Sequence, residues 1–594
     1  MSTIPQKILE VIEKNGSKNA LYYKESGQYH GVPYTQLKSD IKFFSSGLLS
    51  LGLTPGDKVV LVSENRPEWV ISDISIMQLG GINVPLFVNS SPEDMEYIIE
   101  HSEAKFLIAS NATIVKKLEA VKGSLGSLCS IITMETLSSD VVDVLSMTDV
   151  KSSGHNDIEK NQPEIEKRLL GLKSTDTASI IYTSGTTGKP KGVMLSHENF
   201  LSNVDACTRR VDLSEINSCL SFLPLCHVLE RTAGYYTTFL SGIAIWYAES
   251  VETVPDNLVE AKPDLAVSVP RLYEKMYAKV IDAVEKGSPV KKKIFSWAVK
   301  TGKAYFHNQI AGNAQPGLLS LHKKIAAKLV FDKLKVKLGG NLKFFISGGA
   351  PLSKDIAEFF GSAGILIYEG YGLTETSPVL AVNSQMGLSL GTVGRPLDNV
   401  EVKIAEDGEI LAKGPNIMKG YFKNDEASKE IIDGEGWLHT GDIGELEDGY
   451  LKITDRKKDL IVTANGKNVA PQILENLLKL DPFITEAAVY GDKQSYLVAL
   501  LVPDFEKLKE LAEEKEINYK DMAELVQKYD VLEYFLERVD ACQADLSGYH
   551  QVKKITLLAE DFTIDNAELT PSLKLKRRVV GEKHKKLIEK MYNN

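Results

Sequence analysis

A run of glycine, hydroxyl and lysine residues follows a stretch typical of a buried strand. Residues 180–192 read IIYTSGTTGKPKG, and the apolar part of this run ends at Tyr182. Glycines let backbone amides turn toward an anion, hydroxyls donate hydrogen bonds to phosphate oxygens, and lysines add positive charge. The residues available for this are Thr183, Ser184, Gly185, Thr186, Thr187, Gly188, Lys189, Lys191 and Gly192. A plain surface turn is the alternative, but the preceding strand and the two lysines favour a phosphate-binding loop.

Several further segments combine glycine with charged or hydroxyl residues. They read ISGGAPL at 346–352, YEGYGLTET at 368–376, GWLHTGD at 436–442, DRKKDLI at 455–461, NGKNVAP at 465–471 and TPSLKLKRR at 570–578. No GxxxxGK[ST] sequence occurs, which disfavours a nucleoside triphosphatase of the kinase or motor type. Together with the phosphate loop, these segments resemble the adenylate-forming superfamily of acyl-CoA synthetases, firefly luciferase and peptide synthetase adenylation domains. PLCHVLER at 224–231, the ISGGAPLS stretch and the overall length are most similar to long-chain fatty acid–CoA ligases.

The resemblance implies a reaction in two halves, with ATP, Mg²⁺, coenzyme A and a fatty acid as the small molecules involved. A carboxylate attacks the α-phosphorus of ATP and gives acyl-AMP and pyrophosphate. The thiol of coenzyme A then attacks the mixed anhydride and releases AMP. The first half brings an anionic nucleophile to an anionic triphosphate, so charge neutralisation has to carry much of the catalysis. A carboxylate with a pKa of about 4.3 is already ionised at neutral pH and needs no general base.

The resemblance also assigns roles to residues of this sequence. Glu375 resembles the Mg²⁺ ligand of the family, paired with the hydroxyl of Thr183, because Mg²⁺ needs only one carboxylate beside phosphates. Tyr371 resembles the aromatic ring that stacks on adenine, with a core tyrosine as the alternative. Asp442 and Arg456 resemble the two ribose contacts. The ATP and AMP positions implied are Thr183, Ser184, Gly185, Thr186, Thr187, Gly188, Lys191, Gly349, Ala350, Gly370, Tyr371, Gly372, Thr374, Glu375, Asp442, Arg456 and Lys574.

Lys574 matches the catalytic lysine that neutralises the carboxylate and the α-phosphate. The commoner form of the motif has a glycine before this lysine, where this chain has Leu573. Lys576, two residues later, is the other lysine that could match the motif. KLKRR as a basic tail on an acidic protein is the alternative, and such a tail could meet anionic lipid. Lys458 matches the hinge position. Gly466 resembles the loop that the small domain presents to the attacking thiol, with an Asn-Gly hairpin turn as the alternative.

The segment that the family uses for its acyl pocket and gate contains a histidine. His227 lies in an apolar run, so a pocket role and a buried core histidine are both compatible with the sequence. His227 and Gly349 form the acyl-pocket assignment. The neighbouring Cys226 is interpreted as a small buried residue and not as a nucleophile.

The elements that must position these residues are predicted to be α/β layers. Apolar runs and helical patterns alternate over the first 130 residues, which predicts a largely parallel sheet, with a strand at 58–63, a helix at 67–79 and a strand at 106–109. The polar residues 151–166 predict a surface loop or linker, and helices are expected around 289–337. Beyond Arg456 we expect strands at 486–490, 496–501 and 552–558 and charged helices at 505–515, 521–529 and 531–543.

These elements predict an α/β protein with two unequal domains. Residues 1–454 are expected to form a large multi-sheet N-terminal domain that binds AMP and the acyl group. A hinge is expected at 455–460. Residues 461–594 are expected to form a small, mobile α+β C-terminal domain that carries the catalytic lysine.

Length and composition set limits on function. The 594 residues include 69 Lys plus Arg and 80 Asp plus Glu, a formal charge of −11, and 43% are hydrophobic. This balance is typical of a globular protein and disfavours nucleic acid as a partner. Five cysteines without CxxC spacing, no secretory signal and no apolar run of about 18 residues predict a cytoplasmic protein without a spanning helix. A peripheral contact at the inner face of a membrane is compatible with this, and the oligomeric state is not fixed.

Two other functions stay open from the sequence. One is an acyl-AMP ligase that loads a separate acyl carrier protein. The other is a catalytically silent homologue that binds acyl groups or nucleotides. The intact loop residues, Glu375, Asp442, Arg456 and Lys574 favour an enzyme.

Overall fold

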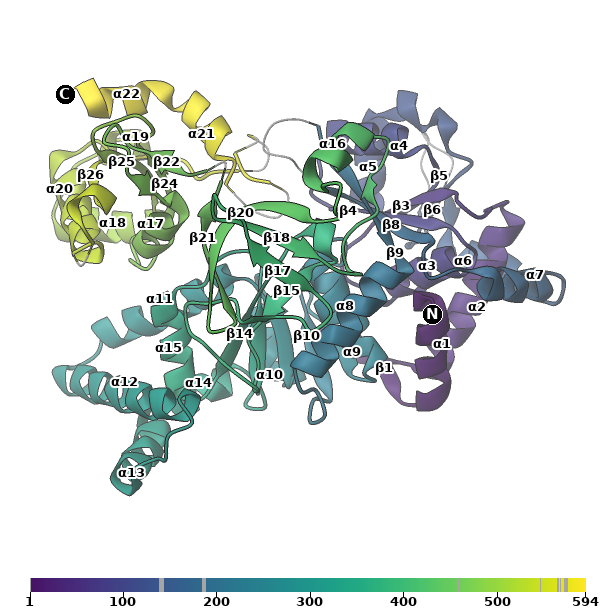
Figure 1. The fold of residues 1–594 in the computed structure, drawn as a ribbon, viewed down its shortest axis with the longest axis horizontal. Coiled ribbons are helices and arrows are strands. Elements are labelled where there is room, and N and C mark those ends of the chain that lie inside the picture. The colour runs from purple at the N-terminus through teal and green to yellow at the C-terminus, as the bar shows by residue number, and fades with distance from the viewer. Residues whose placement is uncertain are drawn as a thin grey trace.

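Two large, mainly parallel sheets form the greater part of the N-terminal region (Figure 1). The computed structural model describes residues 2–137, 144–183, 189–457, 459–544, 546–563, 566, 568–570 and 575–593. Within these residues, the first sheet has the spatial order β19 (Gly420–Tyr421), β9 (Lys191–Ser196), β8 (Thr177–Thr183), β4 (Ile82–Leu86), β3 (Lys58–Val62), β5 (Ala104–Ala109), β6 (Ser130–Thr133) and β7 (Leu145–Ser146). The second sheet has the order β16 (Arg395–Pro396), β15 (Val379–Val382), β14 (Leu366–Gly372), β13 (Phe344–Ser347), β12 (Leu265–Ser268), β10 (Ser218–Ser221), β11 (Ala244–Tyr247), β1 (Asn19–Glu25) and β2 (Gln28–Pro33).

Strand β3 illustrates why the first sheet is buried on both faces. Val59 and Leu61 pack into one hydrophobic core, whereas Val60 and Val62 pack into another, because successive side chains of a strand point to opposite faces. An unbroken apolar run of this kind is typical of parallel sheets covered by helices. The predicted elements at 58–63, 67–79 and 106–109 are confirmed as β3, α3 (Pro67–Gln78) and β5.

Helices cover both sheets, and the helix-rich stretch predicted around 289–337 is confirmed. It contains α12 (Pro289–Ile310), α13 (Gly317–Ala326), the π-helical turn η3 (Ala327–Phe331) and α14 (Asp332–Lys337). The N-terminal region also contains α1 (Ile4–Asn15), α4 (Pro92–Ser102), α5 (Ala112–Ala120), η1 (Lys122–Ser127), α8 (His197–Arg210), α9 (Thr237–Leu240), α10 (Val254–Ala261), α15 (Lys354–Ala363) and α16 (Asp425–Ile431).

The prediction of a surface loop at 151–166 is wrong. These residues belong to α6 (Met147–Asn156) and α7 (Ile158–Gly171), which pack on α2 (Tyr34–Ser50). Only narrow stripes are buried: Met147, Val150 and Gly154 in α6 and Asn161 and Ile165 in α7. The Asn161 side chain donates to the Ser46 carbonyl at 3.0 Å. Both helices therefore read as polar because most of their surface faces water.

A fully buried ion pair joins four elements of the N-terminal region. Arg231, in the π-helical turn η2 (Glu230–Tyr236), pairs with Asp73 of α3, and neither side chain is exposed. Arg231 Nη1 donates to Ser179 Oγ of β8 at 2.7 Å. Asn83 of β4 and the Tyr236 hydroxyl donate to the two Asp73 oxygens at 2.7 and 2.8 Å. The network fixes η2, α3, β4 and β8 relative to one another.

The neighbouring Glu230 is also fully buried. Its carboxyl oxygens make no hydrogen bond of normal geometry with the residues that the structure describes. Burial raises the pKa of Glu230 to about 8, although the nearby Ser221 hydroxyl offsets part of this effect. Glu230 is therefore largely protonated at neutral pH, which avoids the cost of an unpaired buried charge.

A third sheet and a smaller C-terminal region complete the chain. The third sheet has the order β17 (Glu401–Ile404), β18 (Glu409–Lys413), β20 (Leu438–Glu447) and β21 (Tyr450–Arg456). The C-terminal region contains the hairpin β22 (Ile461–Val462) and β23 (Asn468–Val469), a sheet of β24 (Ile484–Tyr490), β25 (Leu497–Pro503) and β26 (Val552–Leu557), and the helices α17 (Pro471–Leu478), α18 (Phe505–Glu514), α19 (Met522–Leu525), α20 (Tyr529–Cys542), α21 (Arg577–Lys583) and α22 (Lys585–Asn593), with the turn η5 (Gly548–His550). Its predicted strands and the predicted helices at 505–515 and 531–543 are confirmed, whereas the helix predicted at 521–529 is limited to α19. The region has hydrophobic cores of its own.

The C-terminal region contacts the N-terminal region through α11 (Pro270–Glu285). Arg271 of α11 forms an ion pair with Glu486 of β24. Lys507 Nζ of α18 lies 4.0 Å from Asp282 Oδ1 at the other end of α11. Leu480 of the C-terminal region also packs against an apolar cluster of the N-terminal region, so the contact combines ion pairs with apolar packing.

Replacing Arg231 with alanine is expected to destabilise the N-terminal region by about 3–5 kcal/mol, because it leaves the Asp73 carboxylate buried and unpaired. The measurement is the urea midpoint of unfolding. Arg209→Ala is the matched control, because Arg209 forms an exposed ion pair with Asp398 at 2.7 Å. That pair is worth at most about 1 kcal/mol. Equal effects of the two substitutions would contradict the assignment.

The Glu230→Gln variant is expected to remove a pH dependence of stability. The folded-state pKa of about 8 lies above the ordinary value of 4.5, so the folded state binds the proton more tightly. The stabilisation is complete below pH 4.5 and is lost as the pH rises toward 8, by at most about 1.4 kcal/mol per pH unit. Urea midpoints at several pH values should therefore favour the variant increasingly as the pH rises. Parallel pH profiles would show that Glu230 ionises freely.

Candidate active site

The two ends of the predicted phosphate loop lie side by side. Strands β8 and β9 pair antiparallel, with Thr183 directly opposite Lys191. Thr183 Oγ1 lies 3.5 Å from the Lys191 carbonyl oxygen and donates to it. The predicted residues Ser184, Gly185, Thr186, Thr187 and Gly188 lie outside the described residues. The hairpin therefore places one hydroxyl and one lysine at the base of the loop.

Tyr421 connects this hairpin with Glu375, which lies in the short turn η4 (Thr374–Thr376). Strand β19 pairs with β9, opposite Val193, so the Tyr421 side chain extends beside the hairpin. Lys191 Nζ lies 5.0 Å from the centre of the Tyr421 ring. The Tyr421 hydroxyl donates to Glu375 Oε1 at 2.8 Å. Burial and the Glu375 charge raise the pKa of Tyr421, so its phenol stays a donor.

The groups around Glu375 suit a hard cation. The carboxylate keeps acceptor positions beyond the Tyr421 bond, and Thr183 adds a hydroxyl at the base of the neighbouring hairpin. In the described part of the chain, no three His, Cys, Asp or Glu side chains gather as a metal site. A set of one carboxylate, a hydroxyl and substrate phosphates fits Mg²⁺, which keeps part of its water shell.

Two glycine-containing segments lie at the ends of the neighbouring parallel strands β13 and β14 of the second sheet. Gly349 follows β13 with a φ of +82°, and the adjacent Gly348 would bring a Cβ within 3.2 Å of the Leu229 side chain. At Gly372 a Cβ would lie 1.6 Å from the Pro378 carbonyl oxygen. Close packing within the chain thus already requires Gly372. The same two segments contain Ala350, Gly370 and Thr374, and Gly370 is directly paired with Val382 of β15.

Asp442 is the meeting point of two predicted site residues. Strands β20 and β21 pair so that Asp442 lies directly opposite Arg456. Arg456 Nε donates to Asp442 Oδ1 at 3.1 Å, and the Tyr371 hydroxyl donates to Oδ2 at 2.6 Å. The Asp442 side chain is only 5% exposed. Burial and the Asp442 charge raise the pKa of Tyr371, which therefore remains a neutral donor.

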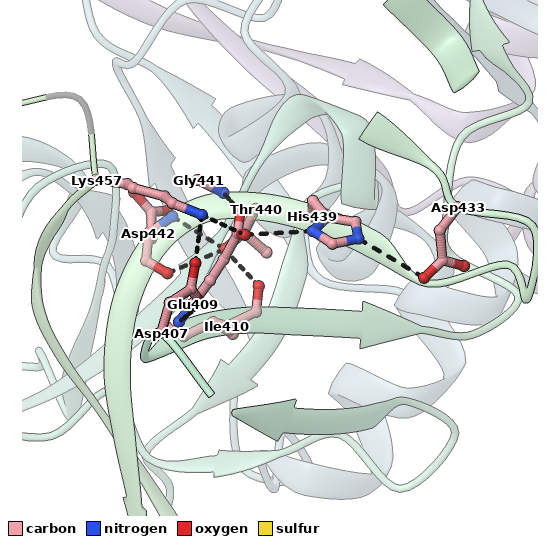
Figure 2. A network of polar contacts seen from close by, with 9 residues as sticks. All are labelled: Asp407, Glu409, Ile410, Asp433, His439, Thr440, Gly441, Asp442 and Lys457. Carbon is pink, nitrogen blue, oxygen red and sulfur yellow. Dashed lines mark hydrogen bonds and ion pairs between the residues drawn. The ribbon is translucent and has the colours of Figure 1, made fainter. Parts of the chain in front are cut away.

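A buried carboxylate holds the turn that carries Asp442 (Figure 2). Glu409 Oε1 accepts a hydrogen bond from the Gly441 amide at 2.9 Å. Its other oxygen lies 3.2 Å from His439 Nδ1 and 3.1 Å from Lys457 Nζ. Lys457 also donates to Asp407 at 2.6 Å. Glu409 therefore ties the residues before Asp442 to the residue just before position 458.

The charges in this network support one another. Burial disfavours the ionised form of Glu409, but hydrogen bonds from His439, Lys457 and the Gly441 amide hold its pKa below the ordinary value. Hydrogen bonds to Asp407 and Glu409 raise the pKa of Lys457. The ion pairs thus hold Glu409 as a carboxylate and Lys457 as a cation around the turn.

The predicted acyl-pocket residue His227 lies just before η2. Its Nδ1 accepts a hydrogen bond from the Leu229 amide at 3.2 Å, so Nε2 carries the proton of the neutral ring. Leu229 contacts the position of Gly348, which brings this segment beside the Gly349 turn. Cys226 is buried, and burial raises the pKa of its thiol, as expected for an unreactive residue.

The remaining predicted residues lie in or next to the C-terminal region. Lys458 and Lys574 lie outside the described residues. Gly466 is an exposed turn of the β22–β23 hairpin with a φ of +70°. Arg577 is held by the Glu475 carboxylate and the Val489 carbonyl, so this member of the KLKRR run is engaged within the protein.

Four residues of these contacts were not predicted from the sequence: Tyr421, Glu409, Lys457 and Arg231. Tyr421 and Glu409 stand between the recognised motifs, where no spacing marks them. Arg231 had a usable signal, because two charged residues end the apolar run PLCHVLER and a buried charge requires a partner.

The model of the AMP-binding enzyme family matches residues 9–422, and that of the AMP-binding enzyme C-terminal domain matches residues 458–594. The chain is 36% identical to the long-chain-fatty-acid–CoA ligase FadD15 of Mycobacterium bovis, over 96% of this chain and 93% of that protein. It is 33% identical to the peroxisomal long chain acyl-CoA synthetase 7 of Arabidopsis thaliana, over 95% of this chain and 82% of that protein.

A solved structure of similar fold is the anthranilate CoA ligase AuaEII in complex with anthranoyl-AMP. The TM-score is 0.73 at 19% sequence identity, and the match covers 99% of this chain and 98% of that one. This likeness extends over both regions of the fold.

The Glu409→Ala variant is expected to loosen the turn at 439–442, because the Gly441 amide loses its acceptor. Loss of a buried hydrogen bond costs about 1–3 kcal/mol, which corresponds to roughly 5- to 150-fold faster local opening. Amide hydrogen exchange of peptides covering β20 measures this. Glu445→Ala is the control, because Glu445 lies in β20 itself and forms only a half-exposed ion pair with Lys452. Unchanged exchange in the Glu409 variant would remove Glu409 from this role.

Proposed function

Since this chain belongs to the AMP-binding enzyme family, we propose that it is a ligase that activates a long-chain fatty acid with ATP and transfers the acyl group to coenzyme A. The observation that carries this proposal is the 36% identity to a long-chain-fatty-acid–CoA ligase over 96% of the chain. The reaction forms acyl-AMP and pyrophosphate first, and acyl-CoA and AMP second. The reaction uses ATP and coenzyme A as substrates and Mg²⁺ as the metal ion.

In the first half-reaction, the fatty-acid carboxylate attacks the α-phosphorus of ATP and pyrophosphate leaves. We assign the residues of the 183–191 loop to the phosphates, with Thr183 and Lys191 at its base. Glu375 and Thr183 would hold Mg²⁺, which supplies positive charge to the phosphate oxygens. Lys574 neutralises the carboxylate and the α-phosphate as they approach. Fixed positive groups are effective here because both reactants are anions.

The adenosine part of ATP is assigned to the constellation around Asp442. Tyr371 stacks on adenine, and its hydroxyl orients the Asp442 carboxylate. Asp442 is assigned to the ribose hydroxyls, with its carboxylate oriented by Tyr371 and Arg456. The segments with Gly349, Ala350, Gly370, Gly372 and Thr374 carry the backbone that passes the purine and the α-phosphate.

The acyl chain is assigned to the region next to His227 and Gly349. The contact between Leu229 and the Gly348 position supports this, because it brings the segment of His227 to the turn of Gly349. The acyl carboxylate then enters beside the Gly349 backbone. The fully buried residues of η2 support the segment from behind.

The second half-reaction requires a different arrangement of the two regions. We place the hinge at 455–460, with Lys458 as the rotating residue, between a large domain at 1–454 and a small domain at 461–594. Gly466 is exposed, and the neighbouring Ala464 and Lys467 contact Gln494 and Tyr549 of the same small region. In the described part of the chain, these contacts of the loop stay within the small region, and this supports an adenylating arrangement. Rotation would bring Gly466 to the thiol.

We also propose that the enzyme works at a membrane surface, where long-chain fatty acids accumulate. No helix within the described ranges is long and apolar enough to cross a bilayer, so the contact would be peripheral. Five free cysteines fit a reducing compartment, which favours the cytoplasmic face.

Product analysis tests the proposed function. Purified protein with palmitate, ATP and Mg²⁺ should yield pyrophosphate and, once coenzyme A is added, palmitoyl-CoA and AMP. Acyl transfer to a holo-acyl carrier protein in preference to coenzyme A would assign the chain to carrier loading instead. Absence of pyrophosphate release with every acid tested would assign it to a silent binder.

The Lys574→Ala variant is expected to lose about 10²- to 10³-fold in adenylation, because one preorganised charge is removed from the meeting point of two anions. Thioester formation from supplied palmitoyl-AMP should stay near the wild-type rate. Lys576→Ala serves as the register control. If Lys576→Ala blocks adenylation and Lys574→Ala does not, the lysine has been assigned to the wrong position.

A further inference from the structure

A helical projection of the N-terminal region combines exposed apolar side chains with an excess of lysine. Helices α12 and α13 extend away from the body at the lower left of Figure 1. Of the nineteen large apolar residues exposed in the described chain, seven lie between residues 290 and 336. Residues 289–337 contain eleven lysines and one acidic residue, Asp332, a formal charge of +10 in a chain of charge −11. The projection is therefore unlike the rest of the surface.

The apolar residues of α13 and η3 form one face. Leu318, Leu321, Ile325 and Leu329 recur at intervals of three and four residues, which aligns them along a helix. Each is between 43% and 67% exposed. A helix of a globular protein normally turns such a stripe toward the core. Here the stripe is directed to solvent, which marks an interaction surface.

Other side chains of the projection attach it to the body. The His322 ring packs edge-on against Trp297 of α12, with ring centres 6.0 Å apart. Ala326 and Phe331 are buried. Lys323 donates to the Ser362 carbonyl of α15. These residues make the packing contacts between the projection and the body, and the exposed leucines do not take part in them.

Four lysines border the exposed stripe. Lys324, Lys328, Lys333 and Lys337 are exposed, and none forms an ion pair with any residue in the described ranges. Leucine and isoleucine flanked by unpaired lysines are typical of helices that lie in the headgroup region of a bilayer. Each lysine near an anionic leaflet strengthens binding by about fivefold.

We propose that the exposed face of α13, η3 and α14 binds an anionic phospholipid bilayer. The leucines would enter the boundary between headgroups and acyl chains, and the lysines would contact the phosphates. A second protein copy is a poorer fit, because a pair of faces of this kind would bring like charges together. The membrane contact is inferred from the surface alone. Its role, which is the delivery of a fatty acid from the membrane to the enzyme, rests on the proposed function.

Co-sedimentation with vesicles tests this surface, using the full chain without ATP or coenzyme A. The wild type should bind vesicles containing phosphatidylglycerol, bind pure phosphatidylcholine vesicles much more weakly, and lose affinity as salt is raised. The double variant Lys324→Glu, Lys328→Glu should bind the anionic vesicles at least about 30-fold more weakly, because two contributions of about fivefold are lost and repulsion is added. Leu321→Ser with Leu329→Ser should weaken binding by about tenfold or more.

Helix α7, which lies at the opposite side of the molecule in Figure 1, supplies matched controls. Lys160→Glu with Lys167→Glu changes the charge equally, and Leu170→Ser replaces a leucine that is 78% exposed. These variants should bind like the wild type. All variants should keep the wild-type urea midpoint of unfolding, which shows that they fold.

The proposal is overturned if the wild type does not bind anionic vesicles, or if the α7 variants lose as much affinity as the α13 variants. It is also overturned if sedimentation velocity shows a dimer that the Leu321, Leu329 variant dissociates. Because vesicle binding is measured without catalysis, failure of the ligase assay would leave this result unaffected.

Discussion

The buried ion pair between Arg231 and Asp73 is the contact on which the arrangement of the site depends. Arg231 belongs to η2, whose preceding segment carries His227 and touches the Gly348 turn of the second sheet. Through Ser179 it also holds β8, which leads into the phosphate loop from the first sheet. Neither partner of this fully buried ion pair can move away without leaving the other charge unpaired. The pair therefore fixes the segment before η2, which touches the second sheet, relative to the first sheet.

Around this frame, the acidic residues of the site are each oriented by a donor. Glu375 accepts from Tyr421, Asp442 from Tyr371 and Arg456, and Glu409 from the Gly441 amide and Lys457. These donors fix the carboxylates before ATP binds, so little reorganisation is needed during the reaction. Lys574, the proposed catalytic lysine, is assigned to the small domain. Placing this lysine on a different domain from the oriented carboxylates would let one pocket serve two reactions.

Sequence reasoning succeeded where the chemistry is local. The strand before the phosphate loop and the parallel β3 and β5 follow from apolar runs, and Asp442 and Arg456 meet because a hairpin pairs residues fourteen positions apart. It failed where a contact spans the chain. Arg231 and Asp73 are 158 residues apart, and Glu375 and Tyr421 are 46 apart. Helices α6 and α7 were missed because only narrow stripes of them are buried, so composition outweighed periodicity.

We propose that the arrangement held by Arg271 and Glu486 is the adenylating one, and a charge exchange across this ion pair tests this most directly. The Arg271→Glu variant brings two carboxylates together. It should slow palmitate-dependent exchange of pyrophosphate into ATP and leave thioester formation from supplied palmitoyl-AMP near the wild-type rate. Adding Glu486→Arg should restore the exchange. Loss of thioester formation with normal exchange, or equal loss of both in a folded protein, would contradict the claim.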